Sequence, residues 1–186
     1  VRSRRQRQMC IRDSPGIVSS RLSKEEYSNN FSDAYPGFTD YEAKVEADRC
    51  YFCYDAPCIS ACPTEINIPL FIRQISTEME EEAAKTIFDQ NILGGMCARV
   101  CPTETLCEEA CVREAAEGKP VKIGRLQRYA TDSIMSKNIH PYIRNENNGK
   151  KIAVIGSGPA GLACSHRLSM LGLSLIHISE PTRPLY

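Results

Sequence analysis

The chain has 186 residues, enough for one or two domains, and its hydrophobic content of 42% and charged content of 25% are ordinary for a globular protein in water. Its 23 basic residues balance its 23 acidic residues, which argues against a dedicated nucleic-acid-binding protein, and the lack of an apolar run of about 18 residues argues against a membrane span. The chain has 10 cysteines, most of them between Cys50 and Cys111. So dense a group indicates a chemical role.

The two ends of the chain need separate treatment. Segment 1–14 is rich in arginine but lacks the apolar run of about 7 to 15 residues that a signal peptide requires. We therefore expect a cytoplasmic protein, whose reducing surroundings favour metal-bound thiolates over disulfides. A transit peptide is an alternative interpretation of the basic segment. We favour a third: Arg5–Ser14 and the tail 174–186 resemble translated sequencing-adapter sequence, so that 1–14 and 174–186 are foreign and the natural chain is a fragment.

Residues 15–45 are polar with scattered aromatic side chains, and Pro36-Gly37 indicates a turn. We interpret this segment as an arm that packs on another surface. Helix-forming residues from Glu42 to Arg49 then lead into the cysteines.

The first cysteine block has the spacing Cys50-x2-Cys53-x4-Cys58-x3-Cys62-Pro63. Bacterial ferredoxins use the run C-x2-C-x2-C-x3-C-P, in which three thiolates bind one 4Fe-4S cluster and the fourth reaches a second cluster. The block differs from that run only by extra residues before Cys58.

Two amphipathic helices are predicted after this block. Pro69 opens the first, whose apolar residues recur at helical spacing: Ile68, Phe71, Ile72, Ile75 and Met79. The second covers 80–90 and stops near Gly94-Gly95. Its apolar face consists of Ala83, Ala84, Ile87 and Phe88.

The second cysteine block is Cys97-x3-Cys101-Pro102-x4-Cys107-x3-Cys111. Residues four apart project from the same face of a helix, so pairs such as Cys58 with Cys62 and Cys107 with Cys111 can serve one cluster or share two. Four-cysteine zinc sites also begin with C-x2-C, but the second block lacks that motif and neither block has a histidine nearby. The spacing therefore favours two iron-sulfur clusters over zinc or redox-active thiols.

A third amphipathic helix is predicted over 123–137. Its apolar stripe consists of Ile123, Leu126, Ala130 and Ile134. Gln127 lies on the same stripe, where an unsatisfied amide would cost about 1 to 3 kcal/mol. The residues alone favour a backbone partner for Gln127 and leave Cys97 as a cluster ligand, because thiolate is the usual ligand.

The character of the chain changes after a polar, turn-rich linker over 141–149. Residues 151–155 form a short apolar run typical of a strand, and residues 162–171 are predicted to form a helix that Gly172 ends. Cys164 is expected to be a small buried residue of that helix.

The turn between that strand and helix is Gly156-Ser157-Gly158-Pro159-Ala160-Gly161, a G-x-G-x-x-G motif in the context of a dinucleotide-binding loop. Its glycines allow the tight turn, the approach of a pyrophosphate and close helix packing, and the helix N-terminus attracts phosphate. The loop alone does not distinguish FAD from NAD. Glu180 has about the spacing of a ribose-binding acid, but it lies in the suspected adapter tail.

The fold class predicted from these elements is mainly α. An α-helical, ferredoxin-like domain with two iron-sulfur clusters covers 15–140, and the linker 141–149 follows. Residues 150–173 form the first β-α unit of a truncated Rossmann-like FAD-binding domain.

A sequence in which two cluster-binding cysteine blocks are followed directly by a flavin-type loop resembles the family that includes the glutamate synthase small subunit and the N-terminal half of dihydropyrimidine dehydrogenase. The resemblance extends from about Glu42 to Gly172. The motifs that carry it are Asp55-Ala56-Pro57-Cys58, Cys97-Ala98-Arg99-Val100-Cys101-Pro102-Thr103-Glu104, Ile123-Gly124-Arg125-Leu126-Gln127-Arg128 and Gly156–Gly161. The length between Cys101 and Cys107, and Gln127 in a position where the glutamate synthase branch has Glu, are more similar to the dihydropyrimidine branch.

The resemblance implies that the whole protein takes a hydride from NAD(P)H onto FAD and passes electrons singly through two 4Fe-4S clusters to a partner. That partner is an FMN-containing dihydropyrimidine dehydrogenase catalytic subunit, which reduces uracil or thymine, or alternatively the glutamate synthase large subunit. The NAD(P)H site is missing from this fragment, and we expect no catalytic acid or base in it. A ferredoxin-like electron carrier with a purely structural nucleotide domain is an alternative of another class.

The resemblance also implies a ligand set for each cluster. One cluster is held by Cys50, Cys53, Cys58 and Cys111, and the other by Cys62, Cys101, Cys107 and Gln127. Cys97 then binds neither cluster, so the resemblance moves the expected eighth ligand from Cys97 to Gln127.

Overall fold

The computed structural model describes residues 23–31, 33 and 35–178 and divides the chain into two units after Pro36. In the first unit, α2 (Lys24–Asn30) begins with a capping box between Ser23 and Glu26 and buries none of its residues. A helix without a buried face is consistent with the predicted arm. The suspected adapter segment 1–14, with Cys10, lies outside the described residues, as does 179–186 with Glu180.

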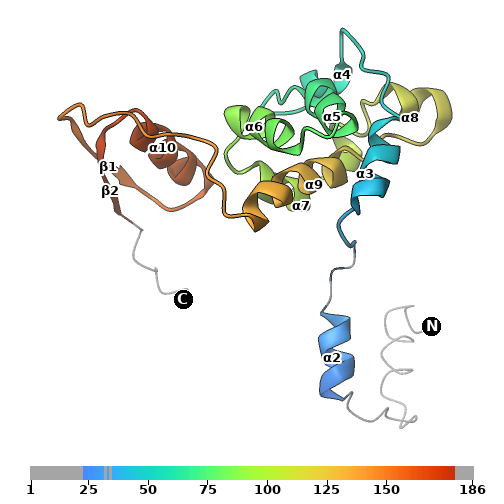
Figure 1. Ribbon diagram of the computed structural model, residues 1–186, viewed down its shortest axis with the longest axis horizontal. Helices are drawn as coiled ribbons and strands as arrows, with labels where there is room; N and C mark the ends of the chain where they lie inside the picture. Colours follow the sequence, from blue (N-terminus) through green and yellow to red (C-terminus); the bar gives the residue numbers. More distant parts are fainter. Residues whose placement is uncertain (1–22, 32, 34, 179–186) are drawn as a thin grey trace, which may run out of the picture. The chain divides into compact units, whose positions relative to one another are not determined.

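The second unit begins with a bundle of helices, labelled in Figure 1. They are α3 (Asp40–Ala47), α4 (Pro57–Ser60), α5 (Ile68–Ser76), α6 (Glu80–Gln90), α7 (Gly94–Val100), the 3-10 turn η1 (Thr103–Thr105), α8 (Val112–Glu117) and α9 (Ile123–Ser136). The prediction of a mainly α fold is confirmed. No helix among the described residues is both long enough and apolar enough to cross a membrane.

Helix α9 lies at the centre of the bundle, in contact with α3, α5, α6 and α7. Its predicted stripe is confirmed, because Ile123, Leu126, Ala130 and Ile134 are all buried. Phe71 of α5 is completely buried against the same core. A buried Ile, Leu or Phe side chain contributes about 1.5 to 3 kcal/mol by leaving water. This stripe therefore holds α7, which carries Cys97, and α3, which lies just before Cys50.

The boundary between α5 and α6 differs in one respect from the prediction. Helix α6 has the predicted bounds, but α5 ends at Ser76, because the N–H groups of Glu78 and Met79 turn back to carbonyls of α5 and Glu78 adopts a left-handed φ of 62°. Met79 therefore leaves the apolar stripe and is 48% exposed. Its predicted place in the core was wrong.

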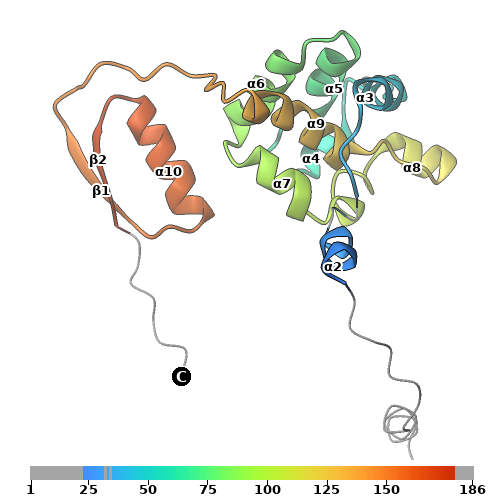
Figure 2. The ribbon, with the colours of Figure 1, turned by 60° about the horizontal axis from the view of Figure 1, so that its bottom comes forward.

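The glycine pair Gly94-Gly95 begins α7 instead of marking the end of α6, which stops at Gln90. A Cβ at Gly94 would overlap the Ile87 side chain, and one at Gly95 would lie 3.1 Å from Sδ of Met135. The glycines therefore permit α7 to pack closely against its neighbours, and Figure 2 shows α7 running beside α9.

The last part of the chain is a parallel βαβ unit. Strand β1 (Lys151–Ile155) has the predicted bounds, α10 (Pro159–Met170) begins earlier than predicted, and β2 (Ser174–Ile178) pairs with β1. Residues 141–148 contain neither helix nor strand. Strand β2 lies within the segment predicted to be adapter-derived, which remains a prediction.

Burial in α10 is slight. Ser165 is its buried residue, whereas Cys164 is exposed. The prediction of a buried Cys164 was wrong, because α10 covers only a two-stranded sheet and Cys164 lies on a face of the helix that this sheet does not cover.

Candidate metal centre

The structure brings four predicted ligands of the first cluster to one cavity. Cys50, Cys53 and Cys58 come from the first block, and Cys111 comes from the end of the second. The rest of the lining is mainly apolar and includes Ile72 of α5. These thiols are all free of disulfides. Three thiols of one block joined by the last thiol of the other is the arrangement of a two-cluster protein.

The loop between Cys50 and Cys53 is held in an unusual backbone conformation. Phe52 has a φ of 51°, in the left-handed region, and its N–H points at Sγ of Cys50 at 3.4 Å. The Arg73 guanidinium lies 4.8 Å from the centre of the Phe52 ring. A bulky residue in this region costs about 1 to 3 kcal/mol and persists where surrounding contacts hold it. The contacts at Phe52 thus hold the backbone in a conformation that directs an N–H group at Sγ of Cys50.

The prediction that cysteines four residues apart share one face of a helix was wrong. Cys58 belongs to α4, but that helix ends at Ser60, before Cys62. Cys107 and Cys111 lie in successive turns ahead of α8, where the N–H of Cys111 bonds to the carbonyl of Glu108 at 3.1 Å. Pro63 directly follows Cys62, and the residue before a proline avoids helical backbone. The segment from Cys107 to Cys111 forms turns instead of a helix.

The remaining cysteines form a second group. The pKa of the Cys101 thiol is raised by burial and then by the neighbouring Cys97 and Cys62. The pKa of Cys107 is raised to about 12 by burial, then by Glu108 and Cys62, with a smaller effect from Cys58. Cys62 thus acts on both Cys101 and Cys107, and Cys97 acts on Cys101.

The protonation of these thiols bears on what they can bind. Burial raises the pKa of Cys58 to about 12, with further increases from Cys50 and Cys111. Such thiols keep their protons at neutral pH unless a cation replaces them, as iron does in a cluster. The described residues contain no three His, Cys, Asp or Glu side chains gathered tightly enough for one metal ion. The donor set of two thiol groups fits two iron-sulfur clusters, in which several irons separate the thiolates.

Gln127 and Cys97 each have a partner near the second group. Gln127, buried in α9, donates from Nε2 to the carbonyl of Gly94 at 2.7 Å. Cys97 of α7 accepts a hydrogen bond at Sγ from Nδ2 of Asn91 at 3.1 Å. The backbone partner that the residues alone favour for Gln127 is therefore present, and both side chains lie where α7 meets α9.

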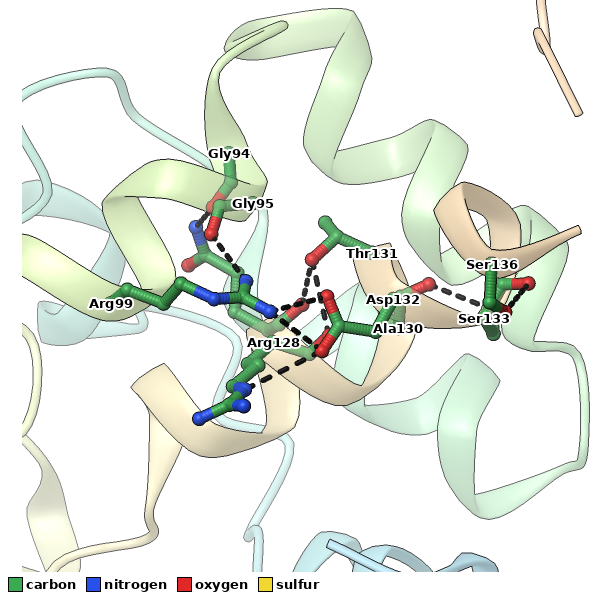
Figure 3. A network of polar contacts seen from close by, with 10 residues as sticks. Gly94, Gly95, Arg99, Arg128, Ala130, Thr131, Asp132, Ser133 and Ser136 are labelled. Carbon is green, nitrogen blue, oxygen red and sulfur yellow. Dashed lines mark hydrogen bonds and ion pairs between the residues drawn. The ribbon is translucent and has the colours of Figure 1, made fainter. Parts of the chain in front are cut away.

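An ion pair fixes α7 on α9 at this place (Figure 3). Arg99 lies between Cys97 and Cys101 on α7, donates from Nη1 to the carbonyl of Gly95 at 2.8 Å and reaches both carboxylate oxygens of Asp132 from Nη2 at 2.8 Å. Arg128 approaches the same carboxylate at 3.4 Å. Because Asp132 belongs to α9, the contact holds the second cysteine block against the core helix.

Two charged side chains at the cysteine groups were not found from the sequence. Arg113 lines the first cavity, and Glu108 is buried beside Cys107. Each lies one or two residues from a cysteine of the second block. Their closeness in sequence to a cysteine could have indicated these two residues, but sequence spacing does not distinguish a buried charged side chain from a solvated one.

The glycine loop has the geometry that a phosphate loop needs. Gly156 has a φ of 108°, and a Cβ at Gly161 would overlap the Gly156 carbonyl. Helix α10 begins at Pro159 after Gly158, and no side chain caps its N-terminus. Its first N–H groups are thus left for an external acceptor such as phosphate. Ser157 and Ala160 complete the predicted loop.

Comparisons with known proteins agree with this geometry. A family model described as dihydropyrimidine dehydrogenase domain II, 4Fe-4S cluster, matches residues 27–139. The NAD-dependent dihydropyrimidine dehydrogenase subunit PreT of Salmonella typhimurium is 42% identical over 156 residues, and that of Escherichia coli K12 is 40% identical over the same length. Each match covers 84% of this chain and 38% of the relative. The chain thus spans little more than a third of the length of these relatives.

Proposed function

This chain belongs to the dihydropyrimidine dehydrogenase domain II, 4Fe-4S cluster, family, and from that premise we propose that it is the electron-transfer module of a cytoplasmic NAD(P)H-dependent oxidoreductase. The whole protein passes electrons from NADH through FAD and two 4Fe-4S clusters to an FMN-containing catalytic subunit. That subunit reduces uracil or thymine to the dihydropyrimidine. The related PreT proteins are named as NAD-dependent dihydropyrimidine dehydrogenase subunits, which supports this acceptor over the glutamate synthase large subunit.

The observation that carries the proposal is the cavity shared by Cys50, Cys53, Cys58 and Cys111. Thiols from two distant segments converge on it, and apolar side chains such as Ile72 and Val121 surround them. Since burial raises the pKa of Cys50 and of Cys58, the site suits a positively charged iron core that takes thiolate ligands.

A bound 4Fe-4S cluster supplies the ability to accept and release one electron. The side chains of this chain do the rest. The thiolates hold the irons, the apolar lining excludes water from them, and the N–H of Phe52 donates to a ligand sulfur. Exclusion of water and hydrogen bonds to sulfur are the means by which a protein sets a cluster potential.

The glycine loop Gly156–Gly161 supplies the phosphate-binding part of the FAD site in this proposal. Support comes from its position between β1 and α10 and from the uncapped N-terminus of α10. In this proposal NAD(P)H binds to another part of the whole protein. A ferredoxin-like carrier that binds no nucleotide is the competing function, and the open N-terminus of α10 argues against it.

Iron analysis tests the proposal directly. We expect the 186-residue chain, reconstituted with iron and sulfide without oxygen, to bind about eight irons as two 4Fe-4S clusters. The same preparation should not retain FAD in stoichiometric amount, because the loop is only one part of a flavin site. Zinc in place of iron, or about half the iron, would contradict the two-cluster proposal, and stoichiometric flavin would contradict the second expectation.

The identity of the eighth ligand is a separate prediction. We propose that Cys62, Cys101, Cys107 and Gln127 hold the second cluster and that Cys97 is not a ligand. Changing Cys97→Ala should then leave both clusters intact, whereas Gln127→Leu should cause loss of one cluster or change its potential. The electron paramagnetic resonance (EPR) spectrum and the iron content report both. The hydrogen bond from Gln127 to the Gly94 carbonyl is the alternative role for this side chain. If only Cys97→Ala loses a cluster, Cys97 is the eighth ligand and four thiolates hold the second cluster.

A further inference from the structure

Arg113 brings a positive charge to the first cysteine group. Its side chain lines the same cavity as Cys50 and Cys111 and is only 18% exposed. Its Nε donates to the backbone carbonyl of Arg49, immediately before Cys50.

The contacts of Arg113 hold its guanidinium at the rim of the cavity. The group lies 4.2 Å from the centre of the Tyr51 ring, and Nη1 is 2.6 Å from Oε1 of Glu117. Glu117 is 42% exposed, so water screens its charge more than that of Arg113. Arg113 lines the cavity, whereas Glu117 is not among its lining residues.

Glu108 brings the opposite charge to the second cysteine group. It is 8% exposed and directly follows Cys107 in the chain. Oε1 of Glu108 accepts a hydrogen bond of 3.0 Å from the N–H of Gly124, in the first turn of α9. The N-terminus of α9 has no cap from its own flanking residue, and the Glu108 carboxylate takes that place.

A charge close to a cluster changes the free energy of adding an electron. Reduction of a 4Fe-4S cluster adds one negative charge without forming or breaking a bond. A nearby cation stabilises the reduced form and raises the reduction potential, and a nearby anion lowers it. The effect is large where burial limits screening.

We propose that Arg113 and Glu108 tune the two clusters in opposite directions. Arg113 raises the reduction potential of the cluster at Cys50, Cys53, Cys58 and Cys111, and Glu108 lowers that of the cluster at Cys62, Cys101 and Cys107. The inference rests on the proposed function, because it requires both clusters.

The ion pair of Arg113 with Glu117 offers a test that separates charge from structure. Both Arg113→Met and Glu117→Gln break this pair, so a purely structural role predicts similar effects. Tuning by charge predicts opposite effects: Arg113→Met should lower the midpoint potential of one cluster, and Glu117→Gln should raise it by a smaller amount. Arg113→Lys, which keeps the charge, should restore most of the wild-type value. The measurement is an EPR-monitored titration of the reconstituted full chain with titanium(III) citrate as the reductant.

The second cluster is tested with Glu108→Gln. The glutamine keeps an oxygen that can accept the hydrogen bond from Gly124, so the start of α9 should keep its cap. We expect the midpoint potential of the other cluster to rise while the potential affected by Arg113→Met stays unchanged. Circular dichroism on each variant confirms that the helices are retained.

The possible outcomes separate this inference from the proposed function. Wild-type protein with fewer than about eight irons would contradict the two-cluster function and the tuning with it. Eight irons, with midpoint potentials that do not move in the Arg113 and Glu108 variants, would overturn the tuning alone. Shifts of the same sign in Arg113→Met and Glu117→Gln would also overturn it and would leave Arg113 a structural role.

Discussion

The helical bundle and the βαβ unit are built on different principles. In the bundle, side chains from distant helices, such as Phe71 and Leu126, are completely buried together. In the βαβ unit, apolar residues remain at the surface, with Ile155 77% and Ile176 60% exposed. The order of the βαβ unit comes from its glycine turn and strand pairing. The comparison shows that the bundle is held by buried side chains from distant helices, whereas the βαβ unit depends more on backbone pairing between β1 and β2.

The largest test of this comparison is a cavity in the bundle. Phe71→Ala should lower the free energy of unfolding by about 3 to 5 kcal/mol, because it removes a fully buried ring. Ile155→Ala in β1 is the matched change and should cost less than about 1 kcal/mol, since most of the side chain is already in water. Urea unfolding of the iron-free chain followed by circular dichroism measures both. Equal losses would mean that the two regions unfold as one structure.

The glycines of the two regions sharpen the comparison at a smaller scale. Gly94→Ala places a methyl group against Ile87 and should cost about 1 to 3 kcal/mol by overpacking. A Cβ at Gly158 meets no atom within 4 Å, so Gly158→Ala should cost less, about 0.5 to 1 kcal/mol, because Ala is a poorer N-cap residue than Gly. Thermal unfolding of the two variants side by side checks this, and a neutral Gly94→Ala would disprove the close contact of α7.

The smallest effect concerns helix starts and pH. Backbone and side-chain hydrogen bonds from Thr39 lower the pKa of Glu42 below its ordinary value of 4.5. A lowered pKa in the folded chain means that the capping box stabilises α3 above about pH 4.5 and loses this contribution as the pH falls through the folded pKa. Glu42→Gln should reduce the loss of stability as the pH falls below about 4.5, and unfolding midpoints measured across that range report the change. An unchanged acid slope would show that the carboxylate contributes nothing.

The sequence predicted well what local patterns determine. The bounds of α6 and β1 and the buried face of α9 follow from periodicity, and the glycine loop from its motif. The errors come from tertiary contacts. Gly94 looks like a helix terminator until α7 is packed beside Ile87, and Cys164 looks buried until α10 is seen to cover only two strands.

The candidate site also contains features that the sequence predicts and features that depend on tertiary contacts. Spacing alone predicted that the cysteines are cluster ligands, and the resemblance to a family supplied the grouping of Cys111 with the first block. The roles of Arg113 and Glu108 could not be predicted, because they depend on contacts with residues distant in the sequence: Arg113 packs on Tyr51, and Glu108 bonds to Gly124. Such contacts have no signature in a single sequence.

Cys111 meets Cys50, Cys53 and Cys58 across a segment that contains α5, α6 and α7. A metal cluster bound to all four thiolates would therefore be a cross-link that closes a long loop of the chain. In the unfolded chain that closure costs conformational entropy, but the packed helices already hold the ends together. Iron that binds only this arrangement stabilises it by mass action. Loss of the cluster would then weaken the whole bundle and not merely the loop around the metal.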